Sequence, residues 1–240
     1  MTVPLLVLHA AGLDGRCADL LGMDGIISVT MLGHGERAPA RRGLSLLDMA
    51  DEVVGWTSEP LDVVGLSLGG MVAMHLALAH PRRIRSLVLA CTTARTDTRL
   101  LLERAEATKT SSRAETERVT LQRWFTAEAL GRDPVPLGVE YARSCLRRID
   151  KQSFAEVWRA ISAHDVLDRL SEIYAPTTCV AGTHDISTPP DDVADMAHRL
   201  PDARLVRINA AHMALLEQPH EFRQIVLDHL AWITGHATGD

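Results

Sequence analysis

One short stretch, residues 61–80, strongly limits the folds open to this chain. Leu61–Leu66 is an almost continuous apolar run, which is typical of a strand that is buried on both faces. The run meets Ser67 directly, and residues 69–80 then follow the pattern of an apolar helix that Pro81 ends. Parallel strands need crossover connections of this kind, so the stretch predicts one unit of a parallel sheet.

The same alternation of short apolar runs and helical patterns recurs along the chain. Five further strands are predicted at Leu5–His9, Ile26–Met31, Ser86–Cys91, Thr177–Ala181 and Arg204–Ile208. Further helices are predicted from Ser45, where Asp48 completes a capping box, to about Trp56, and at Asp191–Leu200 and Pro219–Trp232. We therefore expect an α/β fold with a mostly parallel sheet of about six strands, covered by helices on both faces.

A segment of different character interrupts this pattern. Residues 96–164 are rich in Arg, Glu and helix-forming residues, hold no convincing strand, and contain Trp124, Phe125, Phe154 and Trp158. We interpret them as a helical lid inserted into a core made of residues 1–95 and 165–240. The alternative is a run of surface helices with no part in binding.

Composition excludes several classes of protein. The formal net charge of −6 and the pI near 6.0 give no sign of a nucleic-acid partner. Four widely spaced cysteines with no C-x-x-C pair favour reduced, buried thiols over disulfides or a zinc site. The apolar N-terminal run is too short to cross a membrane and has no basic segment before it. We expect a cytoplasmic protein without membrane contact, and the sequence does not indicate an oligomeric state.

The motif Gly65-Leu-Ser-Leu-Gly-Gly70 carries the strongest chemical signal. A serine on a sharp turn between strand and helix exposes its Oγ, and small neighbours let the backbones approach closely. A G-x-S-x-G motif should arise by chance only about 0.1 times in a chain of this length. We therefore predict that Ser67 is a nucleophile, rather than a turn serine with no chemistry.

A serine nucleophile needs a base within hydrogen-bond reach, and His212 is the best of eleven histidines. It follows the last predicted strand, at the sheet end where Ser67 also emerges, and sites of open α/β sheets lie at the carboxyl ends of the strands. The other candidates precede the serine in the chain or lie on the helix after it: His9, His34, His75 and His80.

A carboxylate should orient the histidine and stabilise its charged form. Asp185 follows the strand Thr177–Ala181 and fits the chain order serine, acid, histidine. Asp191 and Asp192 are rivals, but after Pro189-Pro190 they look like acids of a first helical turn. The backbone N–H groups of Leu68 and Ala11 are the expected donors of an oxyanion hole.

With these residues in place, the chain resembles the α/β-hydrolase superfamily, and within it the 3-oxoadipate enol-lactonase group. The resemblance is carried by Leu6–Gly12, Gly65–Val72, Arg123–Thr126, Ala181–Pro190 and Ala210–Met213. This chain departs from the usual family pattern at its N-terminus and at Ala10. Members usually begin with an antiparallel strand pair, whereas only four residues precede Leu5 here, and Ala10 stands where many members carry glycine.

The resemblance implies a serine hydrolase that cleaves ester-type bonds through an acyl-enzyme, with 3-oxoadipate enol-lactone as a candidate substrate and with no cofactor or metal. Trp124 and Arg123 of the lid are the expected substrate-binding residues, since a guanidinium suits a free carboxylate. Arg143, Arg147 and Arg148 are further lid candidates. A carboxylesterase, a thioesterase or a C–C bond hydrolase remains open, as does a non-catalytic member of the same fold that binds a small molecule.

Overall fold

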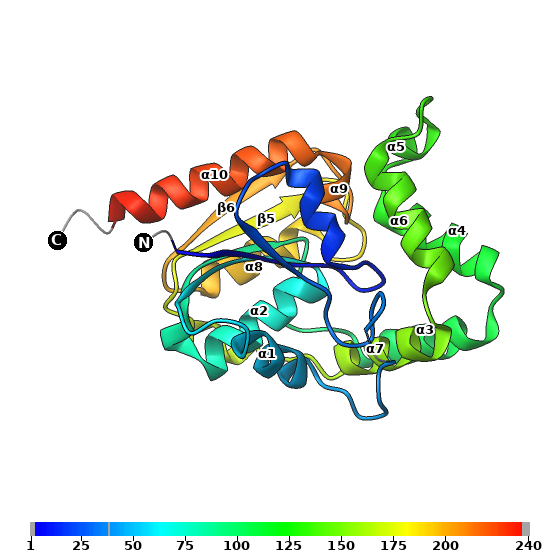
Figure 1. Ribbon diagram of the computed structural model, residues 1–240, viewed down its shortest axis with the longest axis horizontal. Coiled ribbons are helices and arrows are strands. Elements are labelled where there is room, and N and C mark those ends of the chain that lie inside the picture. The colour runs from blue at the N-terminus through cyan, green and yellow to red at the C-terminus, as the bar shows by residue number, and fades with distance from the viewer. Residues whose placement is uncertain (1–2, 38, 237–240) are drawn as a thin grey trace.

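Six parallel strands form the central sheet of the computed structural model, which describes residues 3–37 and 39–236 (Figure 1). They are β1 (Leu5–Leu8), β2 (Ile26–Val29), β3 (Leu61–Leu66), β4 (Ile84–Ala90), β5 (Thr177–Gly182) and β6 (Ala203–Ile208). Every neighbouring pair is parallel, in the order β2-β1-β3-β4-β5-β6. The predicted α/β class and the six-stranded sheet are confirmed. The strand order reverses between β1 and β3, where open α/β sheets bind their ligands.

Helices cover both faces of the sheet (Figure 1). The 3-10 helix η1 (Gly15–Leu21) and α10 (Pro219–His236) contact each other on one face. The opposite face carries α1 (Leu46–Val54), α2 (Leu68–Ala79) and α8 (Pro190–Arg199). The short elements η2 (Pro81–Arg83), η3 (Leu167–Glu172) and α9 (Ala214–Glu217) complete the core.

The helix ends follow local chemistry. The predicted capping box at the start of α1 is present, because Ser45 accepts from the Asp48 N–H while the Asp48 side chain accepts from Ser45. Helix α2 is apolar around most of its circumference and is buried almost throughout, as expected for the helix behind the central strands. It stops at Ala79, and Pro81 opens the next element.

Five helices lie between β4 and β5, within the segment that the sequence marks as different. They are α3 (Thr98–Thr110), α4 (Arg113–Trp124), α5 (Ala127–Gly131), α6 (Leu137–Arg148) and α7 (Lys151–Ser162), and together we name them the helical insertion. Figure 1 shows α4 to α6 standing beyond the carboxyl ends of the strands, while α3 and α7 pack against each other below them. The insertion therefore faces the edge of the sheet where Ser67 emerges.

The core and the helical insertion share one hydrophobic cluster. Buried side chains of the strands, such as Leu66 and Val180, belong to the same cluster as Trp124 and Phe154 of the insertion. All four cysteines are buried free thiols. Among the helices of residues 3–37 and 39–236, none combines the length and the apolar character that a membrane span requires.

Candidate active site

The backbone of Ser67 has an unusual conformation. Its φ of 53° and ψ of −112° lie in a region that residues with a side chain rarely adopt, at a cost of about 1–3 kcal/mol. Surrounding bonds hold it there: the Ser67 N–H donates to the Ala90 carbonyl at 2.9 Å, and the Ser67 carbonyl accepts from the Gly70 N–H at 2.9 Å and from Thr92 Oγ1 at 2.8 Å. The turn between β3 and α2 is therefore strained and firmly fixed.

Glycines around this serine are required by close packing. A Cβ on Gly69 would lie 2.1 Å from the Leu8 carbonyl oxygen, and one on Gly65 would lie 2.5 Å from the carbonyl oxygen of Gly69. Both contacts are far shorter than van der Waals distance. The two glycines thus let α2 begin directly against β1 and β3, which brings Ser67 beside the loop that follows β1.

The side chains of Ser67, His212 and Asp185 form one chain of hydrogen bonds. His212 Nε2 lies 2.9 Å from Ser67 Oγ, and His212 Nδ1 lies 2.8 Å from Asp185 Oδ2. The three residues follow β3, β6 and β5, so the sheet brings together positions that are up to 145 residues apart. All three side chains are buried. The carboxyl ends of the strands place a hydroxyl, an imidazole and a carboxylate in line.

Asp185 is held as a carboxylate. Burial alone would raise its pKa, but the neighbouring His212 ring and the bonds from Thr188 outweigh it, and the net effect lowers the pKa. Its Oδ1 accepts from the N–H groups of Ser187 and Thr188 at 2.7 and 3.0 Å, and its Oδ2 accepts from Thr188 Oγ1 at 2.6 Å. The rivals Asp191 and Asp192 lie exposed in the first turn of α8, as the sequence predicts.

The other candidate histidines have different partners. His9 Nε2 accepts from the Met31 N–H at 3.0 Å while Nδ1 donates to the Ala10 carbonyl, which ties the loop after β1 to the loop after β2. His75 contacts His164, and His80 bonds Asp51 at 2.8 Å. The ring of His34 packs against that of His9, with 4.7 Å between their centroids.

A cavity of about 200 Å³ opens onto Ser67 and His212. Its walls include Ala11, Trp124 and Arg123, three of the residues that the sequence singles out, and Leu68 is the first residue of the adjoining α2. The remaining walls combine apolar side chains of α2, α3 and α7, which are Met71, Leu100, Leu101, Trp158 and Ile161, with polar and charged ones such as Thr93, Arg95, Asp97 and Ser187. A cavity of this size is smaller than the 300–1,000 Å³ typical of drug-sized ligands, so it suits a small molecule.

Arg104 of α3 and Trp158 of α7 are among the cavity residues that were not predicted from the sequence as substrate-binding residues. The sequence does hold a signal for Arg104. It lies three and four residues from Leu101 and Thr108, which are buried on the same face of α3, so it points toward the interior rather than toward solvent.

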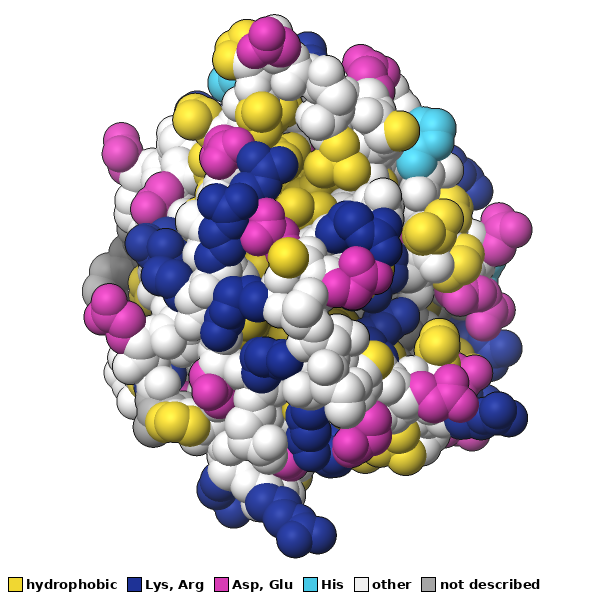
Figure 2. Space-filling model, turned by 90° about the vertical axis from the view of Figure 1, so that its right-hand side faces the viewer, with side chains coloured by type: hydrophobic (Ala, Val, Ile, Leu, Met, Phe, Trp, Pro, Cys, Tyr) yellow, Lys and Arg dark blue, Asp and Glu magenta, His cyan; other side chains and the backbone are white. Residues whose placement is uncertain are grey.

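The other arginines proposed for the lid lie elsewhere. Arg143 pairs with Glu140 and Glu117, and Arg147 also pairs with Glu117. Figure 2 shows the side of the molecule formed by the helical insertion, where basic and acidic side chains are interspersed. Arg148 lines a separate hollow of about 810 Å³, together with Gly12, Asp14 and Ser153. That hollow is larger than the cavity at Ser67, but Ser67, His212 and Asp185 are not among its lining residues.

Within the described part of the chain, no group of three or more His, Cys, Asp and Glu side chains is arranged to hold a metal ion.

Comparison with known proteins shows what the chain as a whole is similar to. The model of the "Alpha/beta hydrolase family" matches residues 5–225. A 3-oxoadipate enol-lactonase of Acinetobacter baylyi is 27% identical over 207 residues, which cover 83% of this chain and 76% of that protein. A pimeloyl-[acyl-carrier protein] methyl ester esterase of Neisseria meningitidis serogroup B is 29% identical over 210 residues, covering 85% and 81%.

Among solved structures, the enol-lactonase from Burkholderia xenovorans LB400 superposes with a TM-score of 0.88 at 27% sequence identity. The match covers 96% of this chain and 92% of that one. The similarity therefore extends over the helical insertion as well as the sheet.

Proposed function

Because this chain belongs to the alpha/beta hydrolase family and is an ester or lactone hydrolase, we propose that it works through an acyl-enzyme formed on Ser67. One observation carries the proposal: Ser67 Oγ lies 2.9 Å from His212 Nε2, and His212 Nδ1 lies 2.8 Å from Asp185 Oδ2. These distances let the imidazole take the hydroxyl proton while the carboxylate holds the ring in the tautomer that accepts it.

The reaction then has two halves. Ser67 Oγ attacks the carbonyl carbon of the ester or lactone as its proton passes to His212, and the tetrahedral intermediate expels the alcohol or enol, which takes that proton from His212. A water molecule next gives its proton to His212 and attacks the acyl-enzyme carbonyl, and collapse of the second intermediate returns the proton to Ser67. In a lactone the leaving oxygen stays attached to the acyl chain, so the product is a single hydroxy or keto acid.

The charge that develops on the carbonyl oxygen needs preorganised donors. We assign this role to the backbone N–H groups of Leu68 and Ala11. Leu68 begins α2, where backbone N–H groups have no partner within the helix, and Ala11 lines the cavity from the loop after β1. The bonds of His9 to Ala10 and Met31 support this loop from behind.

For the substrate, we propose a small lactone or ester, with 3-oxoadipate enol-lactone as the first candidate. The name of the Acinetobacter baylyi relative and the cavity of about 200 Å³ support this choice. Trp124 and Arg123 would contact the substrate from the helical insertion, which would then act as a lid. A second candidate is a methyl ester, which the name of the Neisseria meningitidis relative supports.

Replacement of Ser67 by alanine tests the assignment. We expect Ser67→Ala to lower the turnover of an aryl ester by several orders of magnitude and to abolish labelling by a fluorophosphonate probe, because the hydroxyl serves chemistry rather than packing. Circular dichroism should show an unchanged fold. Ser187→Ala is a matched control, since Ser187 lines the same cavity and lies outside the proton path. A folded Ser67→Ala variant that keeps most of the wild-type activity would contradict the proposal.

A substrate panel resolves the finer assignment. Initial rates on the enol-lactone, a methyl ester and an acyl thioester of the same acyl length should rank the enol-lactone first. A preference for the methyl ester or the thioester would leave the assignment of Ser67 as nucleophile intact and would contradict the enol-lactone as the substrate.

A further inference from the structure

Two guanidinium groups in the wall of the cavity have no anionic partner. Within residues 3–37 and 39–236, no carboxylate lies within 4.0 Å of either Arg104 or Arg123, and Arg123 Nε is fully buried without a hydrogen-bond acceptor. Arg95, at the same cavity, differs because it pairs with Asp165 at 2.8 Å and with Asp168 at 3.3 Å. The unpaired positive charge is therefore confined to one part of the wall.

The surroundings of these two side chains disfavour their charged forms. Burial, and secondly the positive charge of Arg104, lower the pKa of Arg123 from 12.5 to about 9, against a smaller opposite effect from Asp185. Burial also lowers the pKa of Arg104. Two like charges that are partly removed from water destabilise each other, and a bound anion would offset this repulsion.

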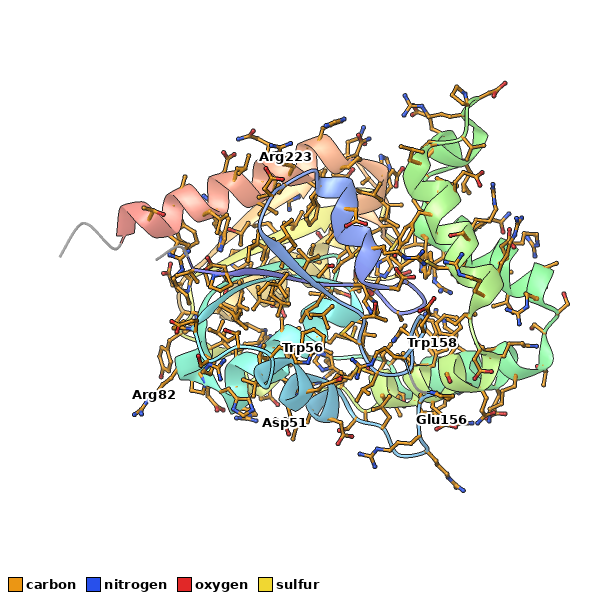
Figure 3. All side chains as sticks on the ribbon, viewed as in Figure 1. Asp51, Trp56, Arg82, Glu156, Trp158 and Arg223 are labelled. Carbon is orange, nitrogen blue, oxygen red and sulfur yellow. The ribbon has the colours of Figure 1, made fainter. Side chains whose placement is uncertain are left out.

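Trp158 holds both groups at the same place. The Cζ atom of Arg104 lies 4.9 Å from the centroid of the Trp158 ring, and that of Arg123 lies 5.7 Å from it, both within the range of cation–π contacts. Figure 3 shows Trp158 on the side of α7 that faces the space between the core and α4 to α6. Side chains of α3 and α4 thus converge on one aromatic ring of α7.

Acidic side chains at the cavity do not neutralise this wall. Asp97 and Asp192 line the same cavity, but both are exposed. The Asp97 carboxylate caps α3 by accepting from the Leu100 N–H at 3.0 Å, and Asp192 lies in the first turn of α8. The cavity therefore has the proposed nucleophile and a positively charged wall within one small volume.

We propose that Arg104 and Arg123 form an anion subsite that binds a carboxylate of the substrate while Ser67 attacks its ester or lactone carbonyl. This inference rests on the proposed function and adds two things to it: Arg104 as a second arginine beside Arg123, and a substrate class wider than the one candidate named above, short acyl compounds that end in a carboxylate. A planar carboxylate matches the fork of a guanidinium, and the small cavity limits the number of carbons between the two ends of the substrate.

The test uses two substrates that differ only in charge. One is the mono-aryl ester of glutarate, which ends in a carboxylate, and the other is the aryl ester of the corresponding half-amide, which is neutral and nearly the same size. The ratio of their kcat/KM values, anionic over neutral, isolates the subsite from the chemistry, because the leaving group is the same. For the wild type we expect this ratio to be about 10 or more.

Arg104→Gln and Arg123→Gln should each lower this ratio by about 10- to 100-fold, mainly through loss of activity on the anionic ester. Arg143→Gln is the matched control. It removes the same formal charge from the insertion, but Arg143 pairs with Glu140 and Glu117 away from the cavity, so the ratio should stay at the wild-type value.

A measurement on the wild type alone guards against variants that do not fold. Glutarate should inhibit hydrolysis of the neutral ester competitively, and glutaramide should inhibit it far less. A wild type that prefers the neutral ester, or Arg variants that lose both substrates equally, would overturn the subsite. The proposed function fails separately, if hydrolysis of the neutral ester persists in Ser67→Ala.

Discussion

At the scale of single residues, the Asp185 carboxylate is surrounded by hydrogen-bond donors that occupy both of its oxygens. Its two carboxylate oxygens accept from the N–H groups of Ser187 and Thr188, from the Thr188 hydroxyl and from His212. An amide side chain of the same shape has one acceptor oxygen instead of two. Replacement by asparagine therefore forces one of these donors, or the histidine, to lose its partner.

We expect Asp185→Asn to lower kcat on an aryl ester by on the order of 10³- to 10⁴-fold, because His212 would lose the partner that fixes its tautomer. Asp191→Asn makes the same change of charge at an exposed position of α8 and should leave kcat unchanged. Steady-state kinetics on both variants checks this. Equal effects in the two variants would mean that Asp185 acts only through its charge at long range.

The same variant has a pH signature in its stability. A carboxylate with a lowered pKa in the folded state stabilises the fold above its unfolded pKa of about 4, and this contribution disappears as the pH falls through the lowered value. The free energy of unfolding of Asp185→Asn should fall short of the wild-type value at pH 7, and the gap should narrow below about pH 4. Urea unfolding at several pH values measures the gap.

Several site residues could be identified from the sequence because their signals are local. Ser67 stands in a glycine-rich turn between strand and helix, and Asp185 and His212 each follow a strand of the sheet. Arg143 and Arg123 of the insertion had no such signal. Arg143 and Arg123 both lie on helices with many charges, and only tertiary structure shows that Glu117 neutralises the first while the second lines the cavity.

At the scale of elements, the helical insertion is tied to the loop that carries His212. The Met213 N–H donates to the Trp124 carbonyl at 3.0 Å, and Glu217 accepts from the Thr126 hydroxyl on one side and from the Ala211 N–H at 2.9 Å on the other. Glu217 thus joins the start of α5 to the residue before His212. Movement of the insertion would therefore shift the backbone on either side of His212.

Glu217→Gln should lower kcat by about 10- to 100-fold, because the amide accepts at one oxygen only and the ring of His212 would lose part of its support. Glu221→Gln, on the exposed side of α10, is the control and should match the wild type. Kinetics with the neutral aryl ester avoids any effect on the anion subsite. If kcat in Glu217→Gln stays at the wild-type value, the link between the insertion and the histidine has no catalytic consequence.

Several predicted element boundaries differ from the observed ones: β4 begins at Ile84 rather than Ser86, and α10 ends at His236 rather than Trp232. The second strand was expected to reach Met31, but β2 stops at Val29, and the Met31 N–H bonds the His9 ring instead of a neighbouring strand. Helix α1 was expected to reach about Trp56 and ends at Val54. There the Gly55 N–H turns back to the Glu52 carbonyl in a tighter turn.

At the scale of the whole molecule, the core and the helical insertion share their apolar interior. Trp124 and Phe154 are almost fully buried in the same cluster as the strands, and a Cβ on Gly138 of α6 would lie 2.1 Å from the Leu216 carbonyl oxygen of α9. The insertion therefore packs directly against the core at these positions.

We expect the two parts to unfold in one cooperative transition. Circular dichroism, which follows all helices, and tryptophan fluorescence, to which Trp124 and Trp158 of the insertion contribute, should give the same urea midpoint. Trp56→Phe and Trp232→Phe in combination would leave only the tryptophans of the insertion as fluorescent reporters. An earlier fluorescence midpoint in that variant would mean that the insertion is an independently unfolding unit.

The left-handed backbone at Ser67 has a consequence for how such a protein could be improved. Glycine adopts this conformation freely, so the most direct relief of the strain is a substitution that also removes the hydroxyl. Directed evolution for heat resistance alone would then reward inactive sequences, and a screen that keeps the enzyme must demand turnover in every round.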